Sequence, residues 1–297
     1  MSSPKVSFWD RIMQSQRNRR RISNALKLLL AFVVLSFSLF PIMWTVSAAF
    51  NPTSGLSGQK LIPDQPTLKH FHTILIERPF GLWMLNTIRV SLIATVLTVL
   101  MTMLAAFSFS RFRFQGRNQL LLLVLLVQVF PALLAMTALY ALMRQIGQYI
   151  PWLGFNSHGG LILLYMGSAM GLNVWLMKGF FDSIPRDIDE SAMIDGATHW
   201  QIFWRIIFPL ARPIISVVAL LAFMGVYSNW VLARIMIQDQ KLFTLMLGLQ
   251  QLIQDDYGQN WGPYAAGAVL GALPIVIIYV ILQDYIVGGL TQGAVKG

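Results

Sequence analysis

The residues best suited to chemistry lie in a short polar stretch, residues 189–209, which reads DESAMIDGATHWQIFWRIIFP inside an otherwise apolar chain. Acidic side chains open this stretch, small side chains follow, and a proline closes it. We expect Glu190 to project, while the small Ser191 and Ala192 leave the backbone beside it approachable. The pattern favours recognition, a knob that fits the cleft of a partner, over a loop that lies passively along lipid headgroups.

Catalytic signatures do not occur in the sequence. It contains no GxxxxGK[ST] phosphate loop, HExxH zinc helix or GxSxG nucleophile elbow, and no cysteine. The four histidines (His70, His72, His158 and His199) fall in predicted loops or at helix ends without a third metal ligand at a suitable spacing. We therefore expect no metal site and no enzymatic activity on this chain, and a surface position for the histidines.

The composition is that of a membrane protein. Of 297 residues, 56% are hydrophobic and only 11% are charged, whereas about a quarter of an ordinary soluble domain is charged. A span needs roughly 20 apolar residues, and six runs without Asp, Glu, Lys or Arg are long enough. The expected fold class is an all-α membrane protein with six transmembrane helices, at 28–50, 86–110, 119–143, 158–178, 213–234 and 263–284.

The distribution of positive charge predicts the orientation. The net charge is +10, and 15 of the 22 basic residues fall on one side of the predicted topology. By the positive-inside rule, both termini and the polar stretch face the cytoplasm. A cleaved signal peptide is the alternative for the first helix, but its apolar run is longer than a typical signal core, which favours an uncleaved anchor.

The polar stretch itself predicts a helical hairpin. Pro185 suits a helix start, acidic residues in the first turn complement the helix dipole, and Gly196 suits the turn at its end. Thr198 and Gln201 are spaced as a capping box for a second helix. One apolar face of that second helix is expected to hold Trp200, Phe203, Trp204, Ile207 and Phe208.

The predicted spans carry few polar residues. Arg89, Arg234 and Asp284 fall near span ends, where they can reach water, and no ionisable residue lies deep in a span. An ion-coupled transporter usually needs such residues, so energy for transport must come from another chain. Three residues are candidates for a substrate pathway: Gln128, Pro131 and Asn229. For Gln128 and Asn229 an interhelical hydrogen bond is the alternative, and the sequence slightly favours it, while a simple helix bend is the alternative for Pro131.

The sequence ESAMIDG, followed after nine residues by IIFP, resembles the EAA motif of ABC importer permeases, E-A-A-x3-G-x9-I-x-L-P. Ser191 replaces the first alanine and Phe208 the leucine. The resemblance covers nearly the whole chain after residue 25 and is strongest to the maltose/maltodextrin permease subunits. It is carried by AFSFSRFRFQG, QVFPALLAMTALYALMRQIGQYIPWLGFNSHGG and GGLTQGAVKG.

The resemblance implies a type I ABC importer permease fold in the inner membrane of a prokaryote. It implies four kinds of partner: a second permease subunit in a heterodimer, two copies of a cytoplasmic ATP-binding cassette ATPase, an extracytoplasmic sugar-binding protein, and membrane lipid. Nucleic acid is not among them. No cofactor is expected on this chain, because ATP and magnesium belong to the ATPase. The implied cargo is a maltose/maltodextrin-type sugar. Another carbohydrate such as trehalose, glycerol phosphate or a different oligosaccharide is the alternative, and an ATP-independent facilitator is a more distant one.

The resemblance also assigns site residues. The ATPase-docking set is Asp189, Glu190, Ser191, Ala192, Met193, Ile194, Asp195, Gly196, Ile206 and Pro209. The terminal residues Gly293, Ala294, Val295, Lys296 and Gly297 resemble a segment that reaches between ATPase subunits, and an idle terminus is the alternative. In the outer loop 250–264, Asp256 and Asn260 are candidate contacts to the binding protein.

These expectations divide the chain into four parts. They are a basic cytoplasmic tail (1–27), a first helix with an extracytoplasmic loop (28–85), a five-helix permease core with the coupling loop 182–212 (86–285), and a cytoplasmic C-terminal tail (286–297).

Overall fold

The computed structural model of the protein describes residues 16–53, 55, 59–129, 132–254 and 260–294. Every regular element within these ranges is a helix, which confirms the predicted all-α class. Among the described residues, four helices are long and apolar enough to cross a bilayer unaided. They are α2 (Gln16–Phe50), α4 (Phe80–Arg111), α7 (His158–Ser183) and α14 (Trp261–Ala294).

Two bent pairs of helices pass the same test of length and composition, so the described residues contain up to six spans if each pair counts as one, which is consistent with the predicted count of six. In the first pair, α5 (Arg117–Val129) and α6 (Ala132–Tyr149) are inclined at 106°. In the second pair, residues His199–Leu210 meet α11 (Arg212–Tyr227) at 79°. The predicted bend at Pro131 lies outside the described residues.

Several helix boundaries differ from the predicted spans. Helix α2 is described from Gln16 and α14 as far as Ala294, so both extend beyond the predicted spans 28–50 and 263–284. Both predicted tails therefore include helical residues. The predicted span 213–234 is wrong at its end: α11 stops at Tyr227, and α12 (Val231–Met236) follows a break at Ser228–Trp230.

Short helices connect the spans. They are α3 (Lys69–His72), η1 (Thr73–Glu77), η2 (Pro151–Leu153), α8 (Arg186–Ile194), α9 (His199–Ile202), η3 (Phe203–Ile207), α10 (Phe208–Leu210), η4 (Gln240–Leu242) and α13 (Leu245–Gln254).

The expected surface position is wrong for His70. This residue is 1% exposed, and its ring nitrogen Nε2 lies 2.7 Å from the carbonyl oxygen of Asn51. Gly262 makes room for this ring, because a Cβ there would lie 2.3 Å from His70 Nε2.

Helix α4 is the centre of the bundle and contacts α7, α11, α13 and α14. It carries hydroxyl side chains at helical spacing, and all of Ser91, Thr95, Thr98 and Thr102 are buried. Small side chains allow helices in a membrane to approach closely. These small buried side chains form a face of α4 that was not predicted from the sequence.

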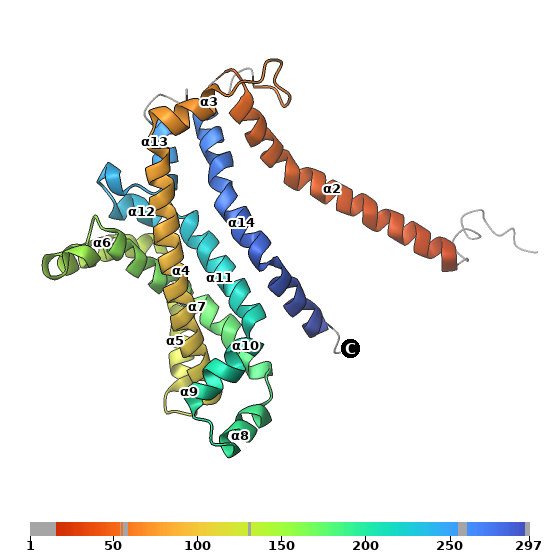
Figure 1. Ribbon diagram of the computed structural model, residues 1–297, viewed down its shortest axis with the longest axis vertical. Helices are drawn as coiled ribbons and strands as arrows, with labels where there is room; N and C mark the ends of the chain where they lie inside the picture. Colours follow the sequence, from red (N-terminus) through yellow and green to blue (C-terminus); the bar gives the residue numbers. More distant parts are fainter. Residues whose placement is uncertain (1–15, 54, 56–58, 130–131, 255–259, 295–297) are drawn as a thin grey trace, which may run out of the picture.

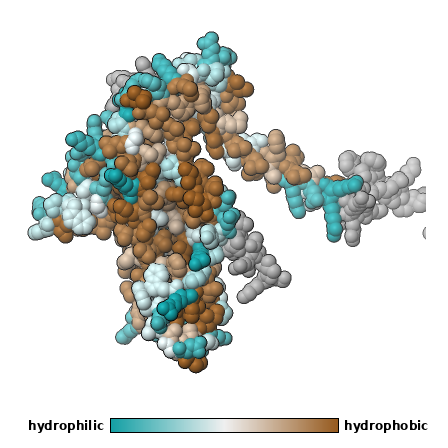
Figure 2. Space-filling view, in the orientation of Figure 1, coloured by the Kyte–Doolittle hydropathy of each residue, from teal (hydrophilic) through white to brown (hydrophobic). Residues whose placement is uncertain are grey.

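The surface reflects the surroundings of a membrane protein. Hydrophobic side chains cover the middle of the bundle and much of α2, whereas hydrophilic side chains gather at the ends and on the side of α6 and α12 (Figure 2). Helix α2 contacts α14 and α3, and it diverges from the other helices (Figure 1). Most of its apolar side chains are exposed, so lipid or another chain must cover them.

Candidate functional site

The polar stretch forms the predicted hairpin at one end of the bundle, where α8 projects beyond α4 and α7 (Figure 1). Asp187 and Asp189 occupy the first turn of α8. The helix ends in a left-handed turn at Gly196, with φ 83°. There the N–H of Ala197 donates to the carbonyl of Ala192 at 2.9 Å, and the N–H of Gly196 donates to Met193 at 3.0 Å. This pair of hydrogen bonds is the Schellman closure, which glycine favours.

The capping box is confirmed at the start of α9. The backbone N–H of Thr198 donates to Gln201 Oε1 at 2.8 Å, and the N–H of Gln201 donates to Thr198 Oγ1 at 3.3 Å. A single π-helical turn, η3, then interrupts the α-helix. Such a turn shifts the positions that share a face, and the predicted apolar face is accordingly divided. Phe203 and Ile207 are buried, whereas Trp200 is 61% exposed.

A buried ion pair fixes α8 to the bundle. Nε of Arg111, the last residue of α4, lies 2.5 Å from Oδ2 of Asp189, and the two side chains are only 7% and 11% exposed. Arg111 also donates to the carbonyl of Ile184 at 3.2 Å. Burial raises the pKa of Asp189 above its ordinary value, and the cations of Arg111 and Arg186 act in the opposite direction. The family resemblance implies that Asp189 belongs to the ATPase-docking set, whereas in the structure its carboxylate pairs with Arg111 of the same chain.

Two further polar contacts join the same elements. Arg186 Nη2 donates to the carbonyl of Ser110 at 2.8 Å, and Ser110 Oγ donates to Asp182 Oδ1 at 2.7 Å. Asp182 in turn pairs with Lys178 at 2.5 Å. The end of α4, the end of α7 and the start of α8 are therefore linked by side-chain contacts as well as by the chain.

Beneath these contacts lies a hydrophobic cluster drawn from α4, α7, α8, α9, η3 and α11. Ala192 belongs to it and is 9% exposed. Phe107 of α4 meets Phe203 with ring centroids 5.0 Å apart. Ile206 is partly buried against the same cluster, and Pro209 is half-buried. Because this core spans six elements, the hairpin and the bundle are packed as one unit.

The remaining residues of the docking set face outward. Ile194 is 87% exposed and Met193 is 42% exposed, and Glu190, Ser191, Asp195 and Gly196 are exposed as well. Large aliphatic side chains so exposed beyond the membrane spans are typical of a surface that contacts another protein. We call Glu190, Ser191, Met193 and Ile194 the outward face of α8. This face contains fewer residues than the ATPase-docking set expected from the sequence.

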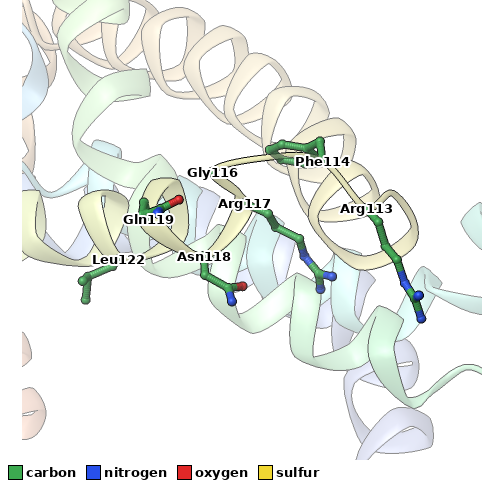
Figure 3. Close-up of a pocket in the computed structure, with 7 residues that line it drawn as sticks. All are labelled: Arg113, Phe114, Gly116, Arg117, Asn118, Gln119 and Leu122. Carbon is green, nitrogen blue, oxygen red and sulfur yellow. The ribbon is translucent and has the colours of Figure 1, made fainter.

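The turn between α4 and α5 adds positive charge at the same end. Arg113 and Arg117 line a hollow of about 450 Å³ together with Phe114, Gly116 and Asn118. Both arginine side chains project to one side of the turn (Figure 3). This turn is one of the segments from which the sequence predicted a cytoplasmic side.

Two of the three pathway candidates meet the same helix. Gln128 Nε2 donates to the carbonyl of Ser168 at 3.4 Å, while the carbonyl of Asn229 accepts from Tyr165 Oη at 3.1 Å. Ser168 and Tyr165 both belong to α7. The predicted position of Asn229 inside a helix is wrong, because it lies in the break after α11, where its Oδ1 accepts from the N–H of Leu232 at 3.1 Å. A local hydrogen bond of this kind competes with helix continuation. Pro131 lies outside the described residues.

The other predicted sites are only partly described. Asn260 precedes α14, and its carbonyl accepts from the N–H of Tyr264 at 3.0 Å, while Asp256 lies outside the described residues. Gly293 and Ala294 are in the last turn of α14, whereas Val295, Lys296 and Gly297 lie outside the described residues. Among the described residues, no group of three or more His, Asp or Glu side chains is placed to hold a metal ion.

Comparison with known proteins matches residues 98–292 to the family described as binding-protein-dependent transport system inner membrane component. The maltose/maltodextrin transport system permease protein MalG of Vibrio vulnificus is 41% identical, over 89% of this chain and 92% of the relative. MalG of Escherichia coli is 36% identical, over 96% and 98%. The galactooligosaccharides transport system permease protein GanQ of Bacillus subtilis is 37% identical, over 93% and 98%.

Solved structures agree on the fold. A chain of a bacterial ABC transporter involved in the import of the acidic polysaccharide alginate superposes with a TM-score of 0.76, over 95% of this chain and 99% of that chain, at 21% identity. A second structure is the alginate ABC transporter in complex with an alginate pentasaccharide-bound periplasmic protein, with a TM-score of 0.65 over 93% of this chain and 96% of that chain. The predicted importer permease fold is therefore confirmed.

Proposed function

The chain belongs to the family of binding-protein-dependent transport system inner membrane components, and from this membership we propose that it forms half of the translocation pathway of an ATP-driven importer for maltose/maltodextrin-type sugars. It is a multi-pass membrane protein and a transport permease. The cargo is supported by relatives whose names specify maltose and maltodextrin and which match the chain over most of its length. The name of GanQ supports a galactose-based oligosaccharide as the second candidate.

The proposed partners follow from the same membership. A second permease subunit completes the pathway, two copies of a cytoplasmic ATPase bind and hydrolyse ATP with magnesium, and an extracytoplasmic binding protein delivers the sugar. The exposed apolar surface of α2 supports contact with lipid and with the second permease subunit. The binding of a periplasmic protein by the solved alginate transporter supports the delivery step.

The coupling mechanism rests on α8. In the proposed complex the outward face of α8 enters a cleft of one ATPase subunit. Glu190 meets a basic residue of that subunit, and Met193 and Ile194 pack against apolar side chains. The observation that carries this proposal is the exposure of Ile194, at 87%, on a helix whose opposite side is held by the Arg111–Asp189 ion pair. One side of α8 is bound to the bundle, and its other side is exposed to a partner. A movement of the ATPase can therefore be transmitted through α8 to the bundle.

The orientation is part of the proposal. Arg111, Arg113, Arg117 and Arg186 lie in one region with α8, which supports a cytoplasmic position by the positive-inside rule. Both termini are then cytoplasmic, in the inner membrane of a prokaryote. On the opposite side, Asp256 and Asn260 are the proposed contacts to the binding protein. The residues from Gly293 to Gly297 are the proposed contacts between ATPase subunits.

Purification of the chain with its co-expressed neighbours tests the proposal. We expect a stoichiometric ATPase and a second permease subunit, and ATP-dependent uptake of maltose, maltotriose and longer maltodextrins by proteoliposomes supplied with the binding protein. Uptake of trehalose, glycerol phosphate or galactooligosaccharides instead would change the assigned cargo. The assignment of the complex as an ATP-driven importer would stand. Sugar passage without any ATPase in the preparation would establish a facilitator and overturn the proposal.

A further inference from the structure

A hollow of about 250 Å³ lies at the opposite end of α4 from α8. Asn86, in the second turn of α4, donates from Nδ2 to the carbonyls of Lys241 and Phe243 at 2.9 and 3.0 Å, and Phe243 lines the hollow. Arg111, which holds α8, is the last residue of the same helix. At about 1.5 Å per residue the two ends are separated by roughly 38 Å, the thickness of a bilayer. With α8 in the cytoplasm, the hollow opens on the extracytoplasmic side.

The lining of this hollow is rich in amides. Its polar side chains come from the segment after α11 and from α13, and they are Arg234, Gln238, Gln240, Gln250, Gln251 and Gln254. We call this site the glutamine hollow. Within the described part of the chain, none of these five amide groups has a hydrogen-bond partner, and no carboxylate lines the hollow. Five side chains that each donate and accept are thus available to a ligand.

The floor of the glutamine hollow is apolar and aromatic. Phe243 and Leu247 line it and are 6% and 3% exposed. A neighbouring hollow shares Gln240, Phe243 and Gln251 and adds Trp83. Trp83 is 3% exposed, and its indole N–H has no acceptor among the described residues. Gly248 makes room for the indole, since a Cβ there would lie 2.1 Å from the ring.

The backbone around the hollow is held in place by hydrogen bonds to side chains of other segments. Asn156 Oδ1 accepts from the N–H groups of Gln238 and Asp239 at 2.9 and 3.0 Å. The N–H of Leu245, the first residue of α13, donates to Thr87 Oγ1 of α4 at 2.6 Å. These bonds tie both lining segments to α4 and to the loop before α7. The site is therefore formed before any ligand arrives, as small-molecule sites usually are.

Such a lining matches the chemistry of a sugar ring. Sugar hydroxyls donate and accept hydrogen bonds as amides do, and the C–H faces of the ring suit an aromatic or aliphatic floor. The described lining residues include no carboxylate, which disfavours a cation, and their single arginine does not require a polyanion. We propose that the glutamine hollow is a carbohydrate-binding site that holds one neutral sugar ring at the extracytoplasmic end of the bundle. This inference rests on the proposed function. The volume of the hollow is below the usual range of about 300–1,000 Å³, which suits one ring of an oligosaccharide.

Direct binding of maltotriose to the assembled complex tests this proposal. The complex of both permease subunits and the ATPase is placed in lipid nanodiscs without the binding protein, and binding is measured by equilibrium dialysis. The variant Gln238→Leu/Gln251→Leu removes one amide from each lining segment, and Gln148→Leu, an exposed glutamine of α6 outside the hollow, is the matched control. We expect binding by the double variant to weaken about tenfold or more, in line with two lost hydrogen bonds, with the control unchanged.

The outcomes separate this proposal from its alternatives. Wild-type binding by the double variant overturns it. The double variant can instead bind maltotriose normally but require more binding protein for uptake. This result assigns the hollow to docking of the binding protein and also overturns the proposal of a carbohydrate site. If the double variant does not assemble, Gln238→Ala at an exposed position must still weaken binding about threefold. A wild-type complex that takes up no sugar contradicts the proposed function, and the dialysis experiment still decides whether the hollow binds carbohydrate.

Discussion

The guanidinium of Arg111 and the carboxylate of Asp189 form an ion pair with Nε and Oδ2 2.5 Å apart, across a boundary between the membrane bundle and the projecting helix α8. Both side chains are almost completely buried. A buried pair of this kind contributes little net stability, because desolvation offsets the attraction, but it fixes the relative position of the elements that carry it. The raised pKa of Asp189 has the same cause, since desolvation outweighs the neighbouring cations.

The first prediction concerns the loss of one partner of this pair. Arg111→Met leaves a buried carboxylate without its cation, and we expect a loss of about 3–5 kcal/mol of stability. Thermal unfolding of the purified complex measures it. Arg113→Met, an exposed arginine of the neighbouring turn, is the matched control and should have little effect. If Arg111→Met/Asp189→Leu is as unstable as Arg111→Met alone, the interpretation of the pair is wrong.

The second prediction is the pH dependence of that variant. The pKa of folded Asp189 lies above the ordinary value of 3.8, so protonation of this group favours the folded state. Its contribution to stability is fully present below 3.8 and is lost as the pH rises through the folded pKa. Without Arg111 the folded pKa rises further, because a cation that lowers it is gone. Acidification should therefore recover more stability in Arg111→Met than in Arg113→Met, and equal pH profiles would contradict this.

The third prediction concerns the outward face of α8. Glu190→Lys reverses a charge at an exposed position, so folding and membrane insertion should be normal while ATP hydrolysis stimulated by binding protein and sugar is lost. The measurement is ATPase activity of the reconstituted complex with and without both ligands. Glu77→Lys, on an exposed glutamate of η1, is the control and should retain stimulation. Full stimulation of the Glu190→Lys complex would refute the docking role.

The fourth prediction separates docking from folding on one helix. Ile194 is 87% exposed and Ala192 is 9% exposed. Ile194→Asp should change the free energy of unfolding by no more than about 0.5 kcal/mol and still weaken association with the ATPase. Ala192→Asp buries an unpaired charge and should impair folding of the permease itself. Quantification of the ATPase retained on affinity-purified permease, beside the permease yield, distinguishes the two effects.

The fifth prediction tests the turn that ends α8. Gly196 has φ 83° and open space around the position of a Cβ, so any cost of substitution there comes from the backbone alone. Gly196→Ala should cost roughly 1–2 kcal/mol, and Gly196→Asn less, because asparagine tolerates this conformation. Gly179→Ala in α7, which also has open space but lies within a helix, should cause no loss. Protease cleavage within residues 182–212 is a suitable local measurement.

Much of the architecture was accessible from local sequence features. The length of the apolar runs predicts the spans, because a bilayer admits only segments that satisfy their own backbone hydrogen bonds. The capping box at Thr198 and Gln201 and the turn at Gly196 were likewise predictable, since each depends on a few neighbouring residues. The hairpin was therefore expected correctly in its helices and its turn.

Only the tertiary structure decided which residues face inward. Asp189 is buried because Arg111, far away in the sequence, ends its helix beside it, and Ala192 is buried because α4, α7 and α11 converge beneath α8. The burial of His70 and the glutamine hollow have the same origin, as both depend on segments joined through the bundle. Local chemistry determines where helices begin and end, whereas burial depends on packing between distant segments, which a local pattern does not contain.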